Sequence, residues 1–373
     1  MRKIRFPLIK PYSDSEELKG VARVLKSGWL TQGRCVNMVE DKIKKYCNAK
    51  FAFLVNSATS GLVAAINALK LDKNDEVIVP SFSFPATANA VFLCGKKVVF
   101  CDIDPATFNI DPGKIEPLIT KRTKAILLVH EFGLMAEMDK ILKIAKKYNL
   151  AVIEDAACAF GSEFRHKKAG SFGDIGVFSF HPRKVITCGE GGCVITGSKD
   201  LAASIKAIRN HGELDGKFIE AGFNFRLSDI QGAILSAQFN RIEKMIAKRI
   251  SLALRYNCLL RPLEERGFLR APQAAKGYRH IYQSYVITLF RNINRDELRN
   301  RLKESGIETQ IGTYCIPQLD FYRKNVRTKA NSFKNASLAY KNSLTLPLYH
   351  DLKEKEQEFI IGRLTEVLRK CAA

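Results

Sequence analysis

The first two-thirds of the chain alternate between short, wholly apolar runs and longer segments with a helical pattern of apolar positions. Short apolar runs are typical of strands buried on both faces, and the helical segments are amphipathic. Strands alternating with helices predict an α/β fold, with a parallel sheet covered by helices on both faces. The predicted strands lie at 51–55, 75–80, 124–130, 151–155, 175–180 and 192–197.

The pattern changes near residue 245. A long amphipathic helix is predicted over 242–267, followed by the strand-like "QSYVITLF" and the helical "NRDELRNRLKESG". A short "IETQIG" and a final helix after "LTLPLY" complete the chain. This succession of helices and short strands predicts a smaller α+β unit. Because 373 residues exceed one compact core, we expect two domains, at 1–245 and 246–373.

The net charge of +22 suggests nucleic acid or an anionic membrane as a possible binding partner. The lysines and arginines are scattered, however, and no run interleaves them with aromatic residues as nucleic-acid motifs do. We therefore expect no nucleic acid, and a phosphate-bearing substrate suits the charge equally well. No apolar run approaches the roughly 20 residues that span a bilayer, and no signal-peptide h-region is present. The expectation is a cytoplasmic protein without a membrane partner.

The 10 cysteines include no CxxC pair and are too sparse for a disulfide scaffold. Reduced, mostly buried thiols are expected, with no metal site.

Polar residues follow several of the predicted strands, at the edge where sheets of this kind bind ligands. Asp155 ends an apolar strand, where an acid is costly to bury unless it is paired; a helix N-cap is the alternative reading. In "VNSATSGLVAA" a helix begins directly after a strand and offers free backbone N–H groups to an anion such as phosphate. A plain Ser/Thr cap would look the same.

Two further signals fall in loops. Phe84 follows a buried strand, where an aromatic ring could stack on a flat ligand or simply pack in the core. Lys184 lies between an apolar strand and the glycines of "GEGG", which let backbone approach a ligand closely. A lysine there could also be an ordinary surface residue.

Taken together, an anion cradle at 57–60, a carboxylate, an amine and an aromatic ring match the needs of pyridoxal phosphate. Its phosphate requires a helix N-terminus, its ring nitrogen requires a carboxylate that keeps it protonated, and its aldehyde requires a lysine for a Schiff base.

The sequence resembles the sugar aminotransferase family (DegT/StrS type) of fold type I pyridoxal phosphate enzymes over nearly its whole length. The matching segments, in order, are "KPYSDSEELKGVARVLKSGWLTQG", "VNSATSGL", "PSFSFPATANAV", "IEDAACAFGS", "FSFHPRKVITCGEGG", "IRNHG", "GFNFRLSDIQGAI" and "LTLPLYHDL". The resemblance implies a large cofactor-binding domain at 1–245 and a small C-terminal domain at 246–373.

The resemblance also implies roles for the residues of the cofactor site. Lys184 would form the Schiff base and move a proton between substrate and cofactor. Asp155 would pair with the ring nitrogen, and Phe84 would stack on the ring. The phosphate would be held by Ala58, Thr59 and Ser179.

Further roles concern the partner subunit and the substrate. Asn224 would reach the phosphate of the neighbouring subunit, which implies a homodimer with shared active sites. Trp29 and Arg226 would border the sugar-nucleotide entrance, and Tyr314 would contact the substrate.

The sequence departs from the family pattern at three places. Cys158 stands near the cofactor ring hydroxyl, where members usually have Gln or His, and a thiol is a weak donor. Ala58 replaces the usual glycine of the phosphate turn. The segment "YCIPQLDFY" lacks a histidine that many members carry. The sugar substrate of a particular family member therefore cannot be assigned to this chain.

The implied activity is transfer of an amino group from L-glutamate to a 3- or 4-keto sugar linked to a nucleotide, by ping-pong kinetics. Amino-sugar, surface-glycan or lipopolysaccharide biosynthesis would be its setting. Three alternatives remain open: an aminotransferase for a keto-cyclitol, a sugar dehydratase, and a non-catalytic cofactor-binding regulator. The dehydratase branch has a histidine in place of the lysine, which disfavours it.

Overall fold

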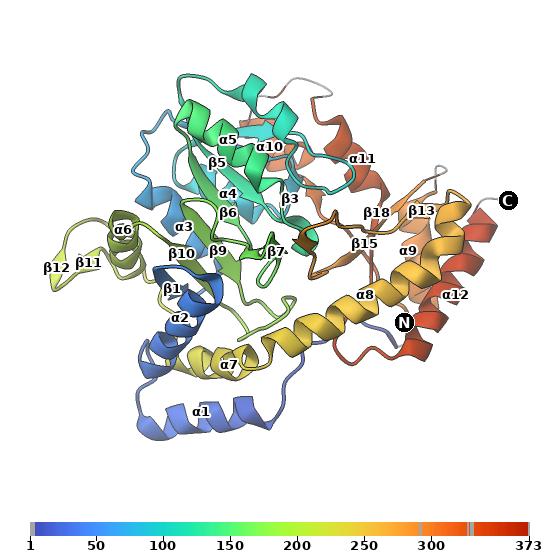
Figure 1. Cartoon of the computed structure of the whole chain (residues 1–373), viewed down its shortest axis with the longest axis horizontal. Helices are drawn as coiled ribbons and strands as arrows, with labels where there is room; N and C mark the ends of the chain where they lie inside the picture. Colours follow the sequence, from blue (N-terminus) through green and yellow to red (C-terminus); the bar gives the residue numbers. More distant parts are fainter. Residues whose placement is uncertain (1–3, 291–292, 327, 329–331, 372–373) are drawn as a thin grey trace.

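The computed structural model describes residues 4–290, 293–326, 328 and 332–371. A seven-stranded sheet forms its centre, in the order β1-β10-β9-β6-β5-β2-β4 (Figure 1). The strands are β1 (Phe51–Val55), β2 (Glu76–Pro80), β4 (Lys97–Cys101), β5 (Thr123–Val129), β6 (Ala151–Asp155), β9 (Ile175–Ser179) and β10 (Gly192–Thr196). All six predicted strands are present, and β4 is an addition.

The sheet is mostly parallel, and strand β10 is its antiparallel member, because it runs antiparallel to both β9 and β1. The other neighbouring pairs, from β9 through β6, β5 and β2 to β4, are parallel. A parallel partner needs a long crossover, whereas the loop between β9 and β10 contains no helix and simply reverses the chain. This loop carries Lys184.

Helices cover both faces of the sheet. Alternate residues of β5 show the division, since Leu127 packs with α3, α4 and α6, whereas Ile126 and Leu128 pack with α2 and α5. These helices are α2 (Arg34–Cys47), α3 (Ala58–Ala68), α4 (Ala86–Leu93), α5 (Met138–Tyr148) and α6 (Lys199–Arg209). The layered α/β arrangement is therefore as predicted.

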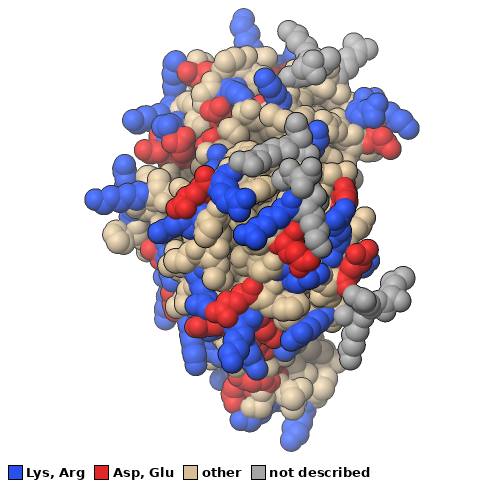
Figure 2. Space-filling model, turned by 90° about the vertical axis from the view of Figure 1, so that its right-hand side faces the viewer, with Lys and Arg blue, Asp and Glu red and all other residues tan. Residues whose placement is uncertain are grey.

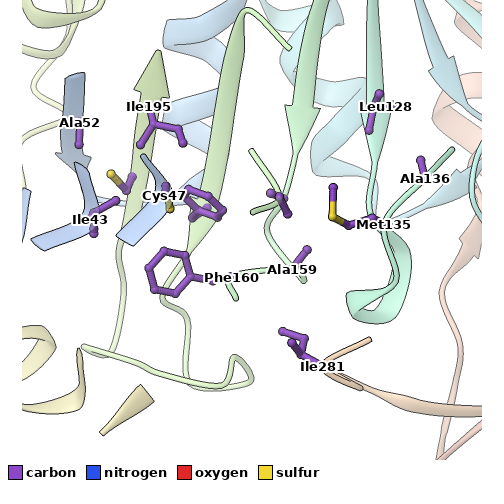
Figure 3. Packing of buried hydrophobic residues seen from close by; sticks show 14 of the residues in the cluster. Ile43, Cys47, Ala52, Leu128, Met135, Ala136, Ala159, Phe160, Ile195 and Ile281 are labelled. Atoms are coloured by element: carbon purple, nitrogen blue, oxygen red, sulfur yellow. The ribbon is translucent and has the colours of Figure 1, made fainter. Parts of the chain in front are cut away.

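Aromatic packing fills the layer beneath β9 and β10. The ring of Phe160 lies 4.8 Å from that of Phe178 and 5.4 Å from that of Phe180, measured between centroids. Figure 3 shows Phe160 beside Cys47 and Ile195, which come from α2 and β10. Burying each such side chain contributes on the order of 2 kcal/mol.

The long helix α8 (Ile242–Glu265) joins the two hydrophobic cores. Near its start, Met245 and Ile246 pack against the large sheet's core, whereas Leu252 and Tyr256 pack in a second core. Figure 1 shows α8 running from below the large sheet to the C-terminal part. The predicted domain boundary at 245/246 falls inside this helix and stays a prediction.

The second core lies between a small antiparallel sheet, in the order β13-β15-β18-β16, and helices α8, α9 and α12. Its elements are β13 (Leu269–Arg270), β15 (Tyr285–Leu289), β16 (Gln310–Ile311), β18 (Ser343–Leu346), α9 (Arg295–Glu304) and α12 (Glu354–Cys371). Phe6, near the other end of the chain, is fully buried in it.

A short ladder ties the C-terminal part to the large sheet. Strand β17 (Tyr314–Cys315) pairs with β3 (Phe82–Ser83), the segment that follows β2. The remaining elements are α1 (Ser15–Ser27), β7 (Glu163–Phe164), β8 (Lys167–Lys168), β11 (Glu213–Leu214), β12 (Lys217–Phe218), α7 (Asp229–Phe239), β14 (Tyr278–Arg279), α10 (Asp320–Asn325) and α11 (Lys334–Asn342).

Charges of both signs share the surface that carries α12. Figure 2 shows lysine and arginine side chains interspersed with acidic ones rather than gathered in one basic field. Arg255, for example, pairs with Glu354 and Glu358 of α12. Within the described ranges, no helix is both long and apolar enough to cross a bilayer.

Candidate active site

The carboxyl ends of the parallel strands bring the predicted site residues to one edge of the sheet. Strand β6 ends at Asp155 and β9 at Ser179, while Glu131 lies just past the end of β5. Strand β10 runs the other way, so its first residue, Gly192, pairs with Ser179 at the same edge. Open α/β sheets bind ligands here.

Asp155 is a buried acid, only 4% exposed. Its Oδ2 accepts a hydrogen bond from Thr87 Oγ1 of α4 at 2.8 Å, and its Oδ1 accepts one from the backbone N–H of Ala157 at 3.1 Å. Burial raises the pKa of Asp155, against the hydrogen bonds and the positive charge of Lys184. No helix begins at this residue, so the N-cap reading of Asp155 is wrong.

Lys184 is half-buried in the loop between β9 and β10, where its backbone N–H donates to His181 O at 2.8 Å. Its Nζ donates to Cys158 Sγ at 3.1 Å. Burial raises the pKa of the Cys158 thiol, and the charge of Lys184 opposes that rise. The amine, the thiol and the Asp155 carboxyl are therefore neighbours, and Lys184 is no ordinary surface lysine.

The N-terminus of α3 forms the expected anion cradle. Ser57 is the N-cap, and it exchanges hydrogen bonds with Ser60, so Ala58 and Thr59 occupy the first turn. Gly192 presses against this turn: a Cβ at Gly192 would lie 2.7 Å from the backbone nitrogen of Ala58. Since Gly192 also pairs with Ser179, the end of β9 lies close to the first turn of α3.

Phe84 follows β3, and its side chain is 64% exposed, so the reading of Phe84 as a core residue is wrong. The β3–β17 ladder brings Tyr314 beside it, with ring centroids 6.4 Å apart. The backbone oxygen of Phe84 accepts from the N–H of Thr87, the residue that donates to Asp155. An uncovered aromatic ring on this segment would suit a flat ligand, although its stacking role stays a prediction.

Asn224 and Arg226 lie on a segment that pairs with the end of β1. The backbone oxygen of Asn224 accepts from Asn56 Nδ2 at 3.3 Å, and Arg226 Nη1 donates to Asn210 Oδ1 at 2.6 Å. The side chain of Asn224 is exposed. Its contact with a neighbouring subunit and the role of Arg226 at the sugar entrance stay predictions.

Trp29 lies in a loop that Asp229 holds in place by accepting hydrogen bonds from the backbone N–H groups of Gly33, Cys35 and Val36. Its indole is 59% exposed and donates to Gln32 O. Across the described part of the chain, Trp29 makes no recorded contact with Lys184 or Asp155. Its predicted place at the substrate entrance is untested.

Sequence reasoning missed three residues of this site, Ser83, Thr87 and Glu131, whereas Gly192 belongs to the "GEGG" segment that it singled out. Ser83 and Thr87 flank Phe84 and supply the hydroxyls that lead to Asp155. Glu131 is 3% exposed, and burial raises its pKa to about 8. Its position directly after a buried strand was the available signal.

A buried hydrogen-bond network supports the turn that carries Glu131. His130 Nδ1 accepts from the backbone N–H of Ala136, so Nε2 carries the proton and donates to Glu154 at 2.8 Å. Glu154 also accepts from the backbone N–H groups of Gly170, Phe172 and Gly173. Since both side chains are fully buried, this network fixes the loop after β5.

These residues fit pyridoxal phosphate. The site offers a half-buried amine, a buried acid, a helix N-terminus and a close backbone approach at Gly192 that leaves no room for a side chain. Lys184 would hold the aldehyde carbon, Asp155 the ring nitrogen, and the first turn of α3 with Ser179 the phosphate.

Known proteins resemble the chain over its whole length. The family model of the DegT/DnrJ/EryC1/StrS aminotransferases matches residues 11–365. GDP-perosamine synthase of Caulobacter vibrioides is 36% identical over 98% of both chains. The UDP-4-amino-4-deoxy-L-arabinose–oxoglutarate aminotransferase of Shewanella sediminis is 33% identical, covering 97% of this chain and 98% of its own.

Among solved structures, PseC of Helicobacter pylori, an aminotransferase involved in the biosynthesis of pseudoaminic acid, superposes with a TM-score of 0.92. The two are 30% identical over 98% of this chain and 99% of that one. Fold type I, the pyridoxal phosphate cofactor and the aminotransferase class are thereby confirmed. The chain belongs to the DegT/DnrJ/EryC1/StrS aminotransferase family.

Proposed function

We propose that this protein transfers an amino group from L-glutamate to a keto sugar linked to a nucleoside diphosphate. The observation that carries the proposal is the position of the Lys184 amine: its Nζ donates at 3.1 Å to Cys158, three residues after the buried Asp155 at the end of β6. The substrate class is supported by relatives whose names refer to GDP- and UDP-linked sugars. The net charge of +22 favours such an anionic substrate.

Each residue has a distinct task in this proposal. When bound, pyridoxal phosphate supplies an electron sink for the carbon that loses a proton. Asp155, kept anionic, holds the ring nitrogen in its protonated form. Lys184 Nζ would take the proton from the α-carbon of the amino donor, and it would deliver a proton to the corresponding carbon of the keto sugar in the second half-reaction.

Four parts of the proposal extend further than the family assignment. Glutamate is supported by the word oxoglutarate in the name of one relative, because oxoglutarate is what glutamate becomes on losing its amine. Ping-pong kinetics follow from one site serving both half-reactions. A homodimer with shared sites and a cytoplasmic location remain predictions.

The test is a two-stage assay. Protein loaded with pyridoxal phosphate is first given glutamate alone, and release of one equivalent of oxoglutarate per site is expected. It is then offered UDP-, GDP- and TDP-linked 3- and 4-keto sugars, with products identified by mass and NMR. Lys184→Ala is the matched control; turnover by that variant, or no amination of any sugar by the parent chain, would contradict the proposal.

A further inference from the structure

The thiol of Cys158 and the amine of Lys184 form a close pair, and the proposed reaction has no use for the thiol. Lys184 Nζ lies 3.1 Å from Cys158 Sγ. Among the sulfur hydrogen bonds recorded in the described part of the chain, this is the one that joins a cysteine to an amine. The pair therefore brings together a group that can be oxidised and a nucleophile.

Backbone hydrogen bonds hold both members of the pair where they meet. The turn after β6 is tied to β9, because the N–H of Ala156 donates to Val177 O at 2.8 Å. The loop that carries Lys184 is closed by Cys188, whose N–H donates to Phe180 O at 3.1 Å. Reacting atoms held about 3–3.5 Å apart are close enough to react without a large rearrangement. The fold thus keeps the sulfur and the nitrogen at a reactive separation.

The thiol depends on its amine neighbour for reactivity. Cys158 and Lys184 are both half-buried rather than sealed in the core, so a small solute has access to them. Peroxides react with the thiolate, and burial raises the pKa of the Cys158 thiol. The adjoining amine can accept the thiol proton, and the charge of Lys184 then opposes that rise.

We propose that Cys158 is a redox modification site, at which a hydroperoxide such as hydrogen peroxide causes its sulfur to become bonded to Lys184 Nζ. In the first step the sulfur attacks the peroxide, so that an S–O bond forms and the O–O bond breaks. Sulfur loses two electrons, the peroxide gains them, and the thiol proton leaves in water. In the second step the neutral amine attacks the sulfenic sulfur: an N–S bond forms, the S–O bond breaks, and hydroxide leaves with an amine proton as a second water.

The geometry favours this product, a sulfenamide, over further oxidation. A sulfenic acid that meets no partner proceeds to the sulfinic acid irreversibly, whereas a nearby thiol or nitrogen captures it. Lys184 Nζ is in contact with the sulfur, and no second cysteine has a recorded contact with Cys158 in the described ranges. Two thiol molecules reverse the link: they return the cysteine thiol and the lysine amine, and they form one disulfide between themselves.

The consequence for the cofactor rests on the function proposed for Lys184. A lysine nitrogen bonded to sulfur cannot also bond the aldehyde carbon of pyridoxal phosphate. Peroxide would therefore close the cofactor-free protein to its cofactor until a thiol reopened it. Bound pyridoxal phosphate would in turn protect Cys158, because it occupies the nitrogen that captures the sulfur.

Peptide mass spectrometry tests the link directly. Cofactor-free protein is treated with hydrogen peroxide, the excess is removed with catalase, and the protein is digested without a reducing agent. We expect the peptides that contain Cys158 and Lys184 to be joined, at a mass two hydrogen atoms below their sum, and to separate in dithiothreitol. The link should be lost in Cys158→Ser. The matched control Cys258→Ser, which removes an exposed thiol, should keep it.

Three results would overturn the inference: Cys158 left without a link, whether unmodified or oxidised to the sulfinic acid; Lys184 joined to a different cysteine; or a link that retains an oxygen atom. The proposed function is read separately, by saturating the protein with pyridoxal phosphate before the peroxide is added. The link should then be lost. A link that forms as fully as before would refute the role of Lys184 as the residue that holds the cofactor, and would leave the sulfur–nitrogen bond established.

Discussion

Replacing Glu131 by Gln should stabilise the cofactor-free protein, and by an amount that grows with pH. Glutamine matches the shape of a protonated glutamate but cannot ionise. In the folded protein the pKa of Glu131 is raised to about 8 from an ordinary value of 4.5. Between pH 4.5 and about 8, Glu131 therefore keeps its proton in the folded protein but releases it in the unfolded chain.

The sign follows from proton linkage. Below pH 4.5 both states are protonated, and the buried carboxyl carries no penalty. As pH rises from 4.5 towards 8, the unfolded chain ionises and the folded protein loses about 1.4 kcal/mol of stability per pH unit. At pH 7 the accumulated penalty is about 3 kcal/mol, and above pH 8 it levels off. The Gln variant escapes this penalty.

Urea unfolding of the cofactor-free parent and variant at pH 5, 6, 7 and 8 measures the difference, at one protein concentration. Because all other titrating groups are common to both proteins, their contributions cancel. Glu190→Gln is the matched control: its side chain is 66% exposed, so its stability profile should parallel that of the parent chain. A Glu131→Gln advantage that stays constant across this pH range would refute the assignment of a raised pKa.

Three further outcomes are expected. Gly192→Ala should raise the dissociation constant for pyridoxal phosphate at least about tenfold, because its Cβ would lie 2.7 Å from Ala58 N. The control Gly197→Ala should leave this constant unchanged, since its Cβ meets nothing within 4 Å. Equilibrium dialysis measures both. Arg249→Met should lower the free energy of unfolding in urea by about 2–4 kcal/mol, because the buried guanidinium donates to the carbonyls of Leu348 and Gln283, which would lose their hydrogen bonds. Lys248→Met, at an exposed position, should change this free energy little, and equal effects of the two substitutions would contradict the reasoning. Mixing inactive Lys184→Ala and Asn224→Asp proteins should restore up to about a quarter of parent activity if each site draws on both subunits, and no recovery would mean unshared sites.

Much of the fold could be predicted because its strands are wholly apolar and its helices are amphipathic. Strand β4 was not predicted because it begins with an exposed lysine, Lys97, and therefore is not an uninterrupted apolar run. The direction of β10 relative to its neighbours could not be predicted from its own residues, because an apolar run fits a parallel or an antiparallel strand equally well. It depends on the loop before it, which contains no helix.

Site residues could be predicted when their own side chain and their position at a strand end already indicated a function. Lys184 and Asp155 stood out because an amine or an acid at the end of a buried strand has few structural uses. Thr87 and Ser83 did not, because a hydroxyl gains such a role only when folding brings it to a buried carboxyl, as it brings Thr87 to Asp155 and Ser83 to Thr87. Glu131 resembled any acid in a loop until its burial was known.

The ladder between β3 and β17 has a consequence for how this protein matures. Ser83 and Phe84 belong to the first quarter of the chain, yet the segment that aligns beside them, Tyr314–Cys315, leaves the ribosome only after most of the protein has been made. Contacts between such distant segments form late, after local structure. A nascent chain would therefore hold an incomplete cofactor pocket until synthesis is nearly finished, and loading with the vitamin-derived cofactor belongs to the last stage of assembly.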